Sequence, residues 1–221
     1  MKHVVVDLEM NPLAKEYKSE REICRNEIIQ IGAVLLDEDY IEIGTFSTLV
    51  KPQFNACIER NIQRLTKIQT EMVQNAPAFE EAIEMFLSWC QSVNDEITVY
   101  QWSESDCLQL MRELELKHIR PDLAKGLTSL VFQDLQKEFG DTLGVSRALS
   151  LKDAVMYAGE DFSGIAHNAL YDARNTAALL RITRVPALRK KLSAVIRAFD
   201  HKPMGTAMGD LFDFGKLGLT A

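Results

Sequence analysis

The sequence predicts a mixed α/β fold in which helices flank one central five-stranded sheet. Three observations favour this class. Runs rich in β-branched residues fill much of the first 50 positions, apolar residues recur at helical spacing further on, and the two patterns then alternate. The expected order is three strands, a helix, a strand, a helix, a strand or helix start, and further helices. Such elements pack as layers around one sheet.

Length, composition and charge set the class of protein. At 221 residues the chain fits one large domain, or one domain with an appendage. Its 47% hydrophobic and 26% charged residues are typical of a soluble globular protein. A net charge of -7 argues against a protein that coats nucleic acid by bulk attraction, because such domains are usually basic. It is compatible with an enzyme that meets phosphate through bound cations.

Cellular context follows from what the sequence lacks. No apolar run is long enough to cross a bilayer, and the start MKHVVVDLEM has no signal-peptide apolar segment or cleavage site. The four cysteines are scattered without a CxxC pair, which disfavours a zinc site or a disulfide framework. We therefore expect a cytoplasmic protein that uses no membrane and keeps its thiols reduced.

The first strands follow from short β-rich runs. The run HVVVD predicts a buried strand over 2–8, and 11–26, with Asn-Pro and many charges, predicts a long exposed loop with room for a helical turn. Residues 28–36 and 40–50 are rich in β formers with a polar break between them, which indicates a hairpin.

The later elements are mainly helical. Apolar residues on one face predict a helix from Phe79 to Cys90, and 96–102 is expected to be a strand followed by Ser103 or Ser105 as helix N-cap. Residues 129–135 fit a strand or a helix start. Helices are expected over 151–159, closed by Gly159, and over 169–184, stopped by Pro186.

Four acidic residues stand where this fold could gather them. Asp7 and Glu9 are two positions apart at the end of the first strand, so both side chains leave the same face, and Leu8 faces the opposite way. Asp106 comes just after the fourth strand. Asp172 lies in the late helix, with His167 in the turn before it. These groups meet if the first and fourth strands are neighbours.

Their chemistry points to metal-assisted phosphodiester cleavage. Four close carboxylates repel one another unless cations are present, and hard divalent ions prefer oxygen ligands. Two Mg²⁺ ions roughly 4 Å apart can hold the attacking and leaving oxygens of a phosphodiester displacement. An imidazole, with an ordinary pKa near ~6.5, is suited to take the proton of the attacking water, and His167 would fill that role.

Three stretches, VVVDLEM, VYQWSESD and HNALYDARNTAALL, resemble the exonuclease motifs of the DEDD superfamily, in its histidine-bearing DEDDh (DnaQ-like) branch. NEIIQIGAV and LTKIQTEMV are similar to the second strand and the connecting loop of that family. The resemblance spans nearly all of residues 2–182, in the expected order. It is strongest for the Eri-type and KapD-like exonucleases, many of which act on RNA.

The resemblance implies a ribonuclease-H-like fold. It also implies 3′-to-5′ hydrolysis of single-stranded nucleic acid to nucleoside 5′-monophosphates with two Mg²⁺, or Mn²⁺ in their place. By match to the motifs, Asp7 would bridge both ions and Glu9 and Asp172 would complete the tighter site. Asp106 would act partly through water, and His167 would be the general base.

Candidate substrate contacts are Met10, Leu13 and Trp102. Met10 and Asn11 stand where many relatives have Thr-Gly, and Leu13 stands where several have an apolar wedge against the last bases. For Met10 and Trp102 the alternative is a place in the core. Ser103 and Glu104 stand near the place where many members carry an Asn, another departure from the family pattern.

The resemblance divides the chain into an exonuclease domain, residues 1–185, and a C-terminal part, 186–221. The latter begins with a basic amphipathic helix that either touches a phosphate backbone or is a solvated face. The tail 204–221 is either a flexible end or cover strand, or a docking peptide for a protein partner. Its MGDLF weakly resembles the motif that bacterial proteins use to bind the sliding clamp. His3, His118 and His201 are expected at the surface.

Three functions are compatible with these features. The favoured one is a metal-dependent 3′-to-5′ exonuclease on single-stranded RNA or short oligonucleotides, and the alternative is a DNA proofreading or repair exonuclease that acts on DNA 3′ ends. A non-catalytic nucleic-acid-binding protein that keeps the fold is disfavoured because all five motif residues are present. A haloacid-type phosphatase is disfavoured because Glu9 stands where it would need a second Asp.

Overall fold

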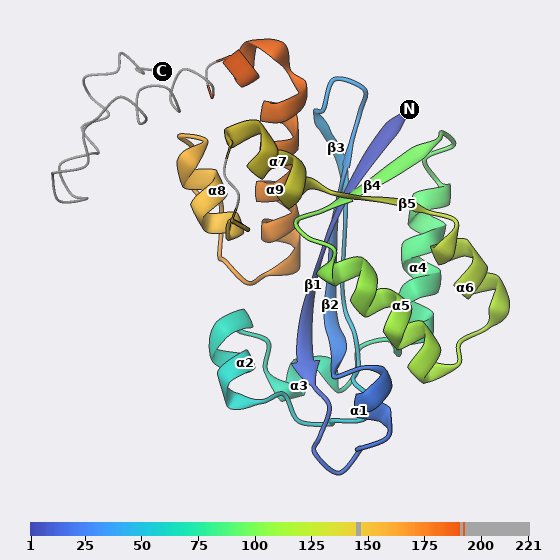
Figure 1. Cartoon of the computed structure of the whole chain (residues 1–221). Helices are drawn as coiled ribbons and strands as arrows, with labels where there is room; N and C mark the ends of the chain where they lie inside the picture. The colour runs from blue at the N-terminus through green and yellow to red at the C-terminus, as the bar shows by residue number, and fades with distance from the viewer. Residues whose placement is uncertain (145–146, 191, 193–221) are drawn as a thin grey trace, which may run out of the picture.

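A computed structural model describes residues 1–144, 147–190 and 192 of the chain (Figure 1). Its centre is a five-stranded mixed sheet, made of β1 (Lys2–Pro12), β2 (Asn26–Leu36), β3 (Glu42–Leu49), β4 (Ile97–Gln101) and β5 (Val131–Asp134). The strand order is β3-β2-β1-β4-β5. The β1–β2 and β2–β3 pairs are antiparallel, and the β1–β4 and β4–β5 pairs are parallel. This confirms the predicted sheet and the adjacency of the first and fourth strands.

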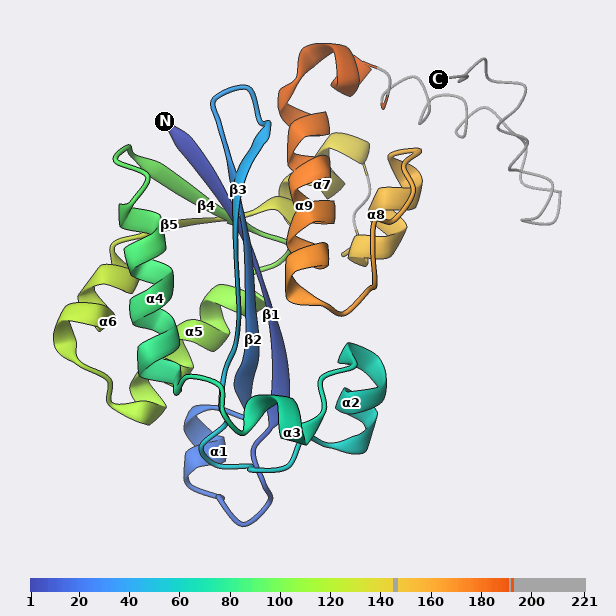
Figure 2. The same cartoon turned by 180° about the vertical axis from the view of Figure 1, so that it is seen from behind.

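Helices cover both faces of the sheet (Figures 1 and 2). One group, α4 (Phe79–Gln91), α5 (Ser105–Lys117) and α6 (Pro121–Thr128), packs on one face, and α7 (Leu135–Leu143), α8 (Leu151–Tyr157) and α9 (Ala169–Arg184) pack on the other. The short helices α1 (Glu20–Ile23), α2 (Arg60–Thr66) and α3 (Thr70–Val73) gather at the end of the sheet where β1 finishes.

The β-branched run at the start of β1 is explained by burial on both faces. Val4 and Val6 point into the apolar cluster formed with α4, α5 and α6, while Val5 points into the cluster formed with α7, α8 and α9. All three are at most 1% exposed. A strand that is covered on both sides needs apolar residues at every position, and not the alternation of a half-exposed strand.

Several local expectations need correction. His3 is buried, at 7% exposure, because its ring stacks on Tyr40 with centroids 4.6 Å apart, so the prediction of a surface histidine is wrong. Neither expected serine is the N-cap of α5. That residue is Glu104, and Ser103 instead accepts the N–H of Ser105 through its hydroxyl, at 3.3 Å. β1 also continues four residues beyond the predicted end.

The basic C-terminal helix is described only in its first part. Residues 186–190 are helical, and Leu192 packs in the same apolar cluster as α9. His201 and the proposed docking tail 204–221 lie outside the described residues. Within the part of the chain that is described, no helix is both long and apolar enough to span a bilayer.

Candidate active site

β1 brings the first two acids to the same side of the sheet. Asp7 and Glu9 share the face of Val5, which α9 covers, whereas Leu8 is 6% exposed and lies in the opposite apolar cluster, as the two-residue period predicts. Glu9 is 8% exposed and Asp7 is half-buried. A register shift after Glu9 interrupts the β1–β2 ladder, so the two carboxylates stand at the last regular rungs.

Asp106 reaches the same region from the β4 side of β1, beyond the point where the β1–β4 pairing ends. The parallel pairing of β1 with β4 ends at Val5 and Tyr100, and beyond it the first turn of α5 lies beside β1. The side chain of Gln101, the last residue of β4, accepts the N–H of Cys107 at 2.7 Å and so ties the start of α5 to the sheet. Asp106 itself is 5% exposed.

The first turn of α9 supplies Asp172, and the residue before its N-cap supplies His167. The N-cap is Asn168, whose Oδ1 accepts the N–H of Tyr171 at 3.4 Å; asparagine is a preferred N-cap, and this signal was missed in the sequence. His167 adopts a left-handed backbone (φ 62°), and its N–H donates to Asp172 Oδ2 at 3.0 Å.

The loop before His167 is bound tightly to α9. Asn175 accepts the N–H of Ser163 at 2.9 Å and donates to its carbonyl at 2.9 Å. At Gly164 (φ 79°) a Cβ would lie 2.2 Å from the ring of Tyr171, so both the backbone angle and the close approach require glycine. These contacts make the loop and the first turns of α9 one unit.

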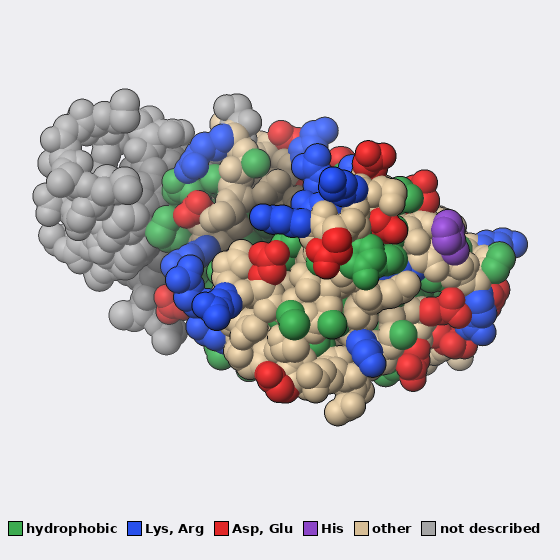
Figure 3. All heavy atoms as spheres, turned by 90° about the horizontal axis from the view of Figure 1, so that it is seen from below, with side chains coloured by type: hydrophobic (Ala, Val, Ile, Leu, Met, Phe, Trp, Pro, Cys, Tyr) green, Lys and Arg blue, Asp and Glu red, His purple; other side chains and the backbone are tan. Residues whose placement is uncertain are grey.

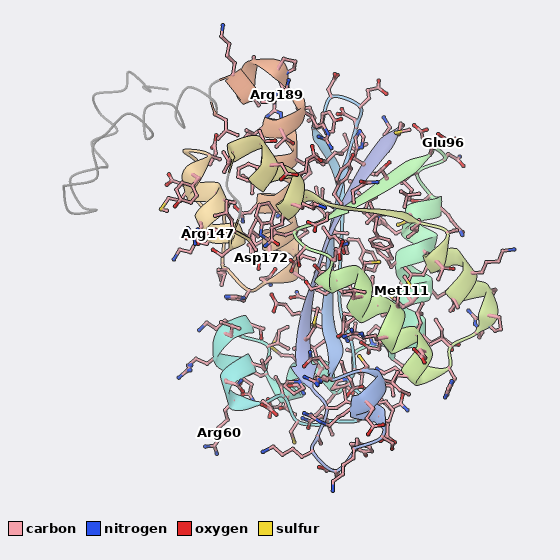
Figure 4. The ribbon with its side chains drawn as sticks, viewed as in Figure 1. Arg60, Glu96, Met111, Arg147, Asp172 and Arg189 are labelled. Carbon is pink, nitrogen blue, oxygen red and sulfur yellow. The ribbon has the colours of Figure 1, made fainter. Side chains whose placement is uncertain are left out.

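Three of the predicted side chains converge on one small space. One ligand atom each from Glu9, His167 and Asp172 lie within 4.8 Å of one another, and the imidazole is exposed while both carboxylates are buried. Figure 4 shows Asp172 at the N-terminal end of α9, beside β1. Its Oδ1 is buried and has no hydrogen-bond partner, which leaves one carboxylate oxygen available to a ligand.

The four acids are close enough for their charges to affect one another's pKa values. Burial, then the neighbouring charges of Asp106, Asp172 and Glu9, raises the pKa of Asp7 well above its ordinary range. Burial, then the charges of Asp172 and Asp106, raises the pKa of Glu9 to about 8.

For Asp106 and Asp172, hydrogen bonds offset part of the rise in pKa that burial causes. Burial raises the pKa of Asp106 to about 7, against the opposing effect of the backbone N–H groups of Leu8 and of Asp106 itself. Burial also raises the pKa of Asp172, although the N–H and the charge of His167 lower it. A cluster in which ionisation is resisted by burial and, at Asp7 and Glu9, also by the neighbouring acids, fits a hard divalent cation, and Asp172 Oδ1 lacks a hydrogen-bond partner.

Two of the three expected substrate contacts lie in the core. Leu13 is 1% exposed and packs with Cys24 and Leu116, so it offers no surface to a base, and its expected wedge role is corrected. Trp102 is 8% exposed, donates from Nε1 to the carbonyl of Leu149 at 3.1 Å, and belongs to the core, as its alternative stated. Met10 is half-buried and packs against the α4–α6 cluster.

Comparison with known proteins also points to an exonuclease. Residues 4–180 match the RNase_T family, described as "Exonuclease". The "3'-5' exoribonuclease 1" of Mus musculus is 29% identical over 163 residues, which cover 69% of this chain and 45% of that protein. The "ERI1 exoribonuclease 2" of Xenopus laevis is 26% identical over 200 residues, covering 80% and 28%. The chain thus spans less than half the length of these curated relatives.

Solved structures show the shared fold. The nuclease domain of 3'hExo, "a DEDDh family member, bound to rAMP", superposes with a TM-score of 0.70 at 22% identity, over 81% of this chain and 90% of that one. Exonuclease I superposes with a TM-score of 0.61 at 16% identity, over 87% and 43%. The ribonuclease-H-like fold is therefore confirmed. Because the family match extends over most of its length, this chain belongs to the exonuclease family, and its likeness to Eri-type relatives is the one that its motifs predicted.

Proposed function

We propose that the chain is a metal-dependent 3′-to-5′ exonuclease that hydrolyses single-stranded RNA or short oligonucleotides to nucleoside 5′-monophosphates. The observation that carries the proposal is the meeting of Glu9, His167 and Asp172 within 4.8 Å, beside two further acids whose pKa values are raised by burial. The exoribonuclease names of the relatives, and the rAMP in the 3'hExo structure, support RNA as the substrate.

The residues present fit two divalent cations, Mg²⁺ or Mn²⁺. Asp7, Glu9, Asp106 and Asp172 would hold them; when bound, such ions offset the charge of the scissile phosphate and make a bound water more acidic. Domain boundaries follow the motifs, with residues 1–185 as the catalytic domain.

We propose that His167 takes the proton. The imidazole of His167 is exposed, so water and substrate can reach it. The backbone N–H of His167 donates to Asp172 and holds the backbone of the residue beside that carboxylate. The oxygen of the attacking water forms a new bond to the terminal phosphorus while the bond to the 3′-oxygen of the preceding nucleotide breaks. The water proton passes to the imidazole, and the departing 3′-oxygen takes a proton from solvent.

The surface charge of the molecule bears on how a nucleic acid approaches it. On the face seen from below, Lys and Arg side chains are interspersed with Asp and Glu side chains (Figure 3). This pattern agrees with the net charge of -7.

A DNA exonuclease is the second candidate. An 88-residue stretch covering 40% of this chain is 36% identical to the "DNA polymerase III PolC-type" of Caldanaerobacter subterraneus, although it covers only 6% of that protein. The chemistry would be the same, and only the contact to the 2′-hydroxyl would differ.

One assay tests both candidates. RNA and DNA oligonucleotides of one sequence, labelled at the 5′ end, are digested with Mg²⁺, with Mn²⁺ or with EDTA. We expect ladders that shorten from the 3′ end, faster on RNA, and no product with EDTA or with the Asp7→Asn variant. Faster digestion of DNA would favour the second candidate. Internal cuts, or activity that persists in EDTA, would refute the nuclease proposal as stated.

Location and protein partners complete the proposal. We place the protein in the cytoplasm, in agreement with its scattered cysteines. The tail 204–221 would dock a protein partner through MGDLF, a stretch outside the described residues. Deletion of 204–221 should remove that partner from a pull-down with the full chain, and an unchanged set of partners would refute the docking role.

A further inference from the structure

We propose that Gln30 and Gly32 of β2 are positioning residues for the catalytic group. They set where the first turn of α9 lies on the sheet, and so hold Asp172 and His167 against the carboxylates of β1. Neither residue is needed to touch substrate. The inference rests on the proposed function, because it assigns these residues a role in the same site.

Both residues stand directly opposite the acids. In the antiparallel β1–β2 ladder, Asp7 pairs with Gly32 and Glu9 pairs with Gln30. Side chains of directly opposed residues lie on the same face of a sheet, here the face that α9 covers. The two rungs that carry the acids are therefore also the two rungs on which α9 is seated, and a shift of α9 changes the distance between the carboxylates.

Gly32 permits the close approach. A Cβ at this position would lie 2.3 Å from the carbonyl carbon of Ala169 and 2.3 Å from the nitrogen of Leu170. Both atoms are backbone, so they cannot swing aside as the end of a side chain could. Gly32→Ala must therefore push the first turn of α9 away from β2 and so from the sheet. At Gly44 in β3, by contrast, the nearest atoms to a Cβ are side-chain carbons of Leu35 at 3.8 Å, an ordinary contact.

Gln30 fixes the helix at that approach. Its Oε1 accepts the N–H of Ala169 at 3.1 Å, and both residues are buried. Ala169 is the first residue of α9, and its N–H is one of those that no helix carbonyl can accept. Asn168 accepts the N–H of Tyr171, so the N-terminus is capped once from its own chain segment and once from the sheet.

Asp172 follows three residues after Ala169 in the same first turn. Because a helix turn moves as a rigid body, displacement of Ala169 displaces Asp172 and, through its hydrogen bond, the backbone of His167. Metal and catalytic constellations tolerate displacements of only about 0.5 Å. A contact that sets this distance is therefore expected to act on the rate and on metal affinity, beyond its effect on stability.

The first experiment compares Gly32→Ala with the matched control Gly44→Ala. Both variants are assayed in the full chain, well below their melting transitions, by calorimetric titration with Mn²⁺ and by steady-state hydrolysis of an RNA oligonucleotide. For Gly32→Ala we expect kcat to fall about 100-fold, with KM within about threefold and weaker Mn²⁺ binding. For Gly44→Ala we expect wild-type values. If Gly32→Ala lowers only the melting temperature, its role is structural and the inference is overturned.

The second experiment removes one hydrogen bond without adding bulk. Gln30→Met keeps the length of the side chain but replaces the oxygen that accepts the N–H of Ala169 with a much weaker acceptor, sulfur, and Gln30→Glu restores a carboxyl oxygen there. Gln136→Met is the matched control, since Gln136 also makes one bond to a backbone group, the Leu149 carbonyl, at 2.7 Å. We expect faster hydrogen exchange of the Ala169 amide and about a 10-fold loss of kcat in Gln30→Met alone, with exchange protection recovered in Gln30→Glu.

The outcomes separate this inference from the proposed function. If the wild-type chain neither binds Mn²⁺ nor hydrolyses RNA, the proposed function fails, and exchange at Ala169 still reports whether Gln30 holds the helix. If the wild type is active and Gln30→Met matches Gln136→Met in exchange, Mn²⁺ affinity and kcat, the positioning role is refuted.

Discussion

The backbone N–H of His167 donates a 3.0 Å hydrogen bond to Oδ2 of Asp172, five residues further along the chain. The left-handed backbone of His167 (φ 62°) allows this bond. One oxygen of Asp172 is thereby used inside the fold, and Oδ1 is left buried without a partner. The candidate base and a candidate metal ligand thus form one local unit.

Replacing His167 separates its two possible roles. Asparagine tolerates the left-handed backbone, so His167→Asn keeps the hydrogen bond to Asp172. If the imidazole acts as the base, we expect kcat to fall about 10²- to 10⁴-fold with Mn²⁺ affinity nearly unchanged. Stopped-flow hydrolysis and calorimetric titration measure the two quantities. A loss of Mn²⁺ affinity as large as the loss of rate would make His167 a metal ligand.

Asp172→Asn should abolish metal binding and activity while the fold is kept. The asparagine retains an oxygen for the N–H of His167, but removes the charge that a cation needs. We expect Mn²⁺ affinity to fall more than about 100-fold, because even outer partners of metal ligands contribute 10- to 100-fold. Asp161→Asn, an exposed acid in the preceding loop, is the control. Normal Mn²⁺ affinity in Asp172→Asn would remove this residue from the metal site.

The stabilisation by Mg²⁺ should grow with pH. The folded, metal-free chain keeps Glu9 protonated up to a pKa of about 8, above its ordinary value of 4.5, so between these values it binds more protons than the unfolded chain. Stability of the metal-free chain therefore falls as pH rises through this window, and is lowest above the folded pKa. Because Mg²⁺ competes with these protons, its effect on Tm should be larger at pH 8 than at pH 6.

Thermal melts with Mg²⁺ or EDTA at both pH values measure the difference. Glu9→Gln removes one of the groups that titrate in this window and should reduce the pH dependence in EDTA, while Asp106, with a pKa of about 7, still contributes. An Mg²⁺-induced rise in Tm that is the same at pH 6 and pH 8 in the wild type would contradict the coupling between metal and protons.

A buried ion-pair network centred on Lys117 of α5 should contribute strongly to the free energy of unfolding. Lys117 Nζ lies 2.9 Å from Glu27 Oε1 and 2.7 Å from Glu113 Oε1, and all three side chains are almost fully buried. Lys117→Met leaves two buried carboxylates without their cation, which typically costs about 3–5 kcal/mol. Urea denaturation measures the loss of unfolding free energy.

The matched control is Arg120→Met. Arg120 pairs with three carboxylates, Glu80 at 3.3 Å, Glu84 at 3.0 Å and Asp122 at 3.9 Å, but these groups are exposed. Solvent screens such pairs, so little change is expected. If both variants unfold at the same urea concentration, burial does not make the Lys117 network more important for stability than the exposed Arg120 pairs.

The acids could be predicted because their signals are local. Asp7 and Glu9 share a face through the two-residue period of a strand, and Asp106 and Asp172 follow from their positions at helix starts. Burial was harder to predict. His3, Leu13 and Trp102 were each candidates for exposed roles in at least one interpretation, and all three are buried by residues distant in sequence.

The short helices α2, α3 and α6 were also missed, and of α7 only a strand or helix start over 129–135 was expected. Each spans no more than nine residues, too few for a clear amphipathic pattern, and an isolated helix of that length is marginal in water. Packing against the sheet or against neighbouring elements stabilises them, and this packing involves residues that the local sequence does not contain.

The strand pattern, the family and five candidate catalytic residues could be predicted from the chain alone, because periodicity and motif spacing are properties of nearby residues. Which side chains stay accessible, and how far α9 stands from β1, depends on contacts that form only in the folded protein. That distance depends on Gln30 and Gly32, which meet Ala169 across 137 or more positions of chain. Contacts between segments so far apart leave no periodic trace in either segment, so folding must bring them together before they can be seen.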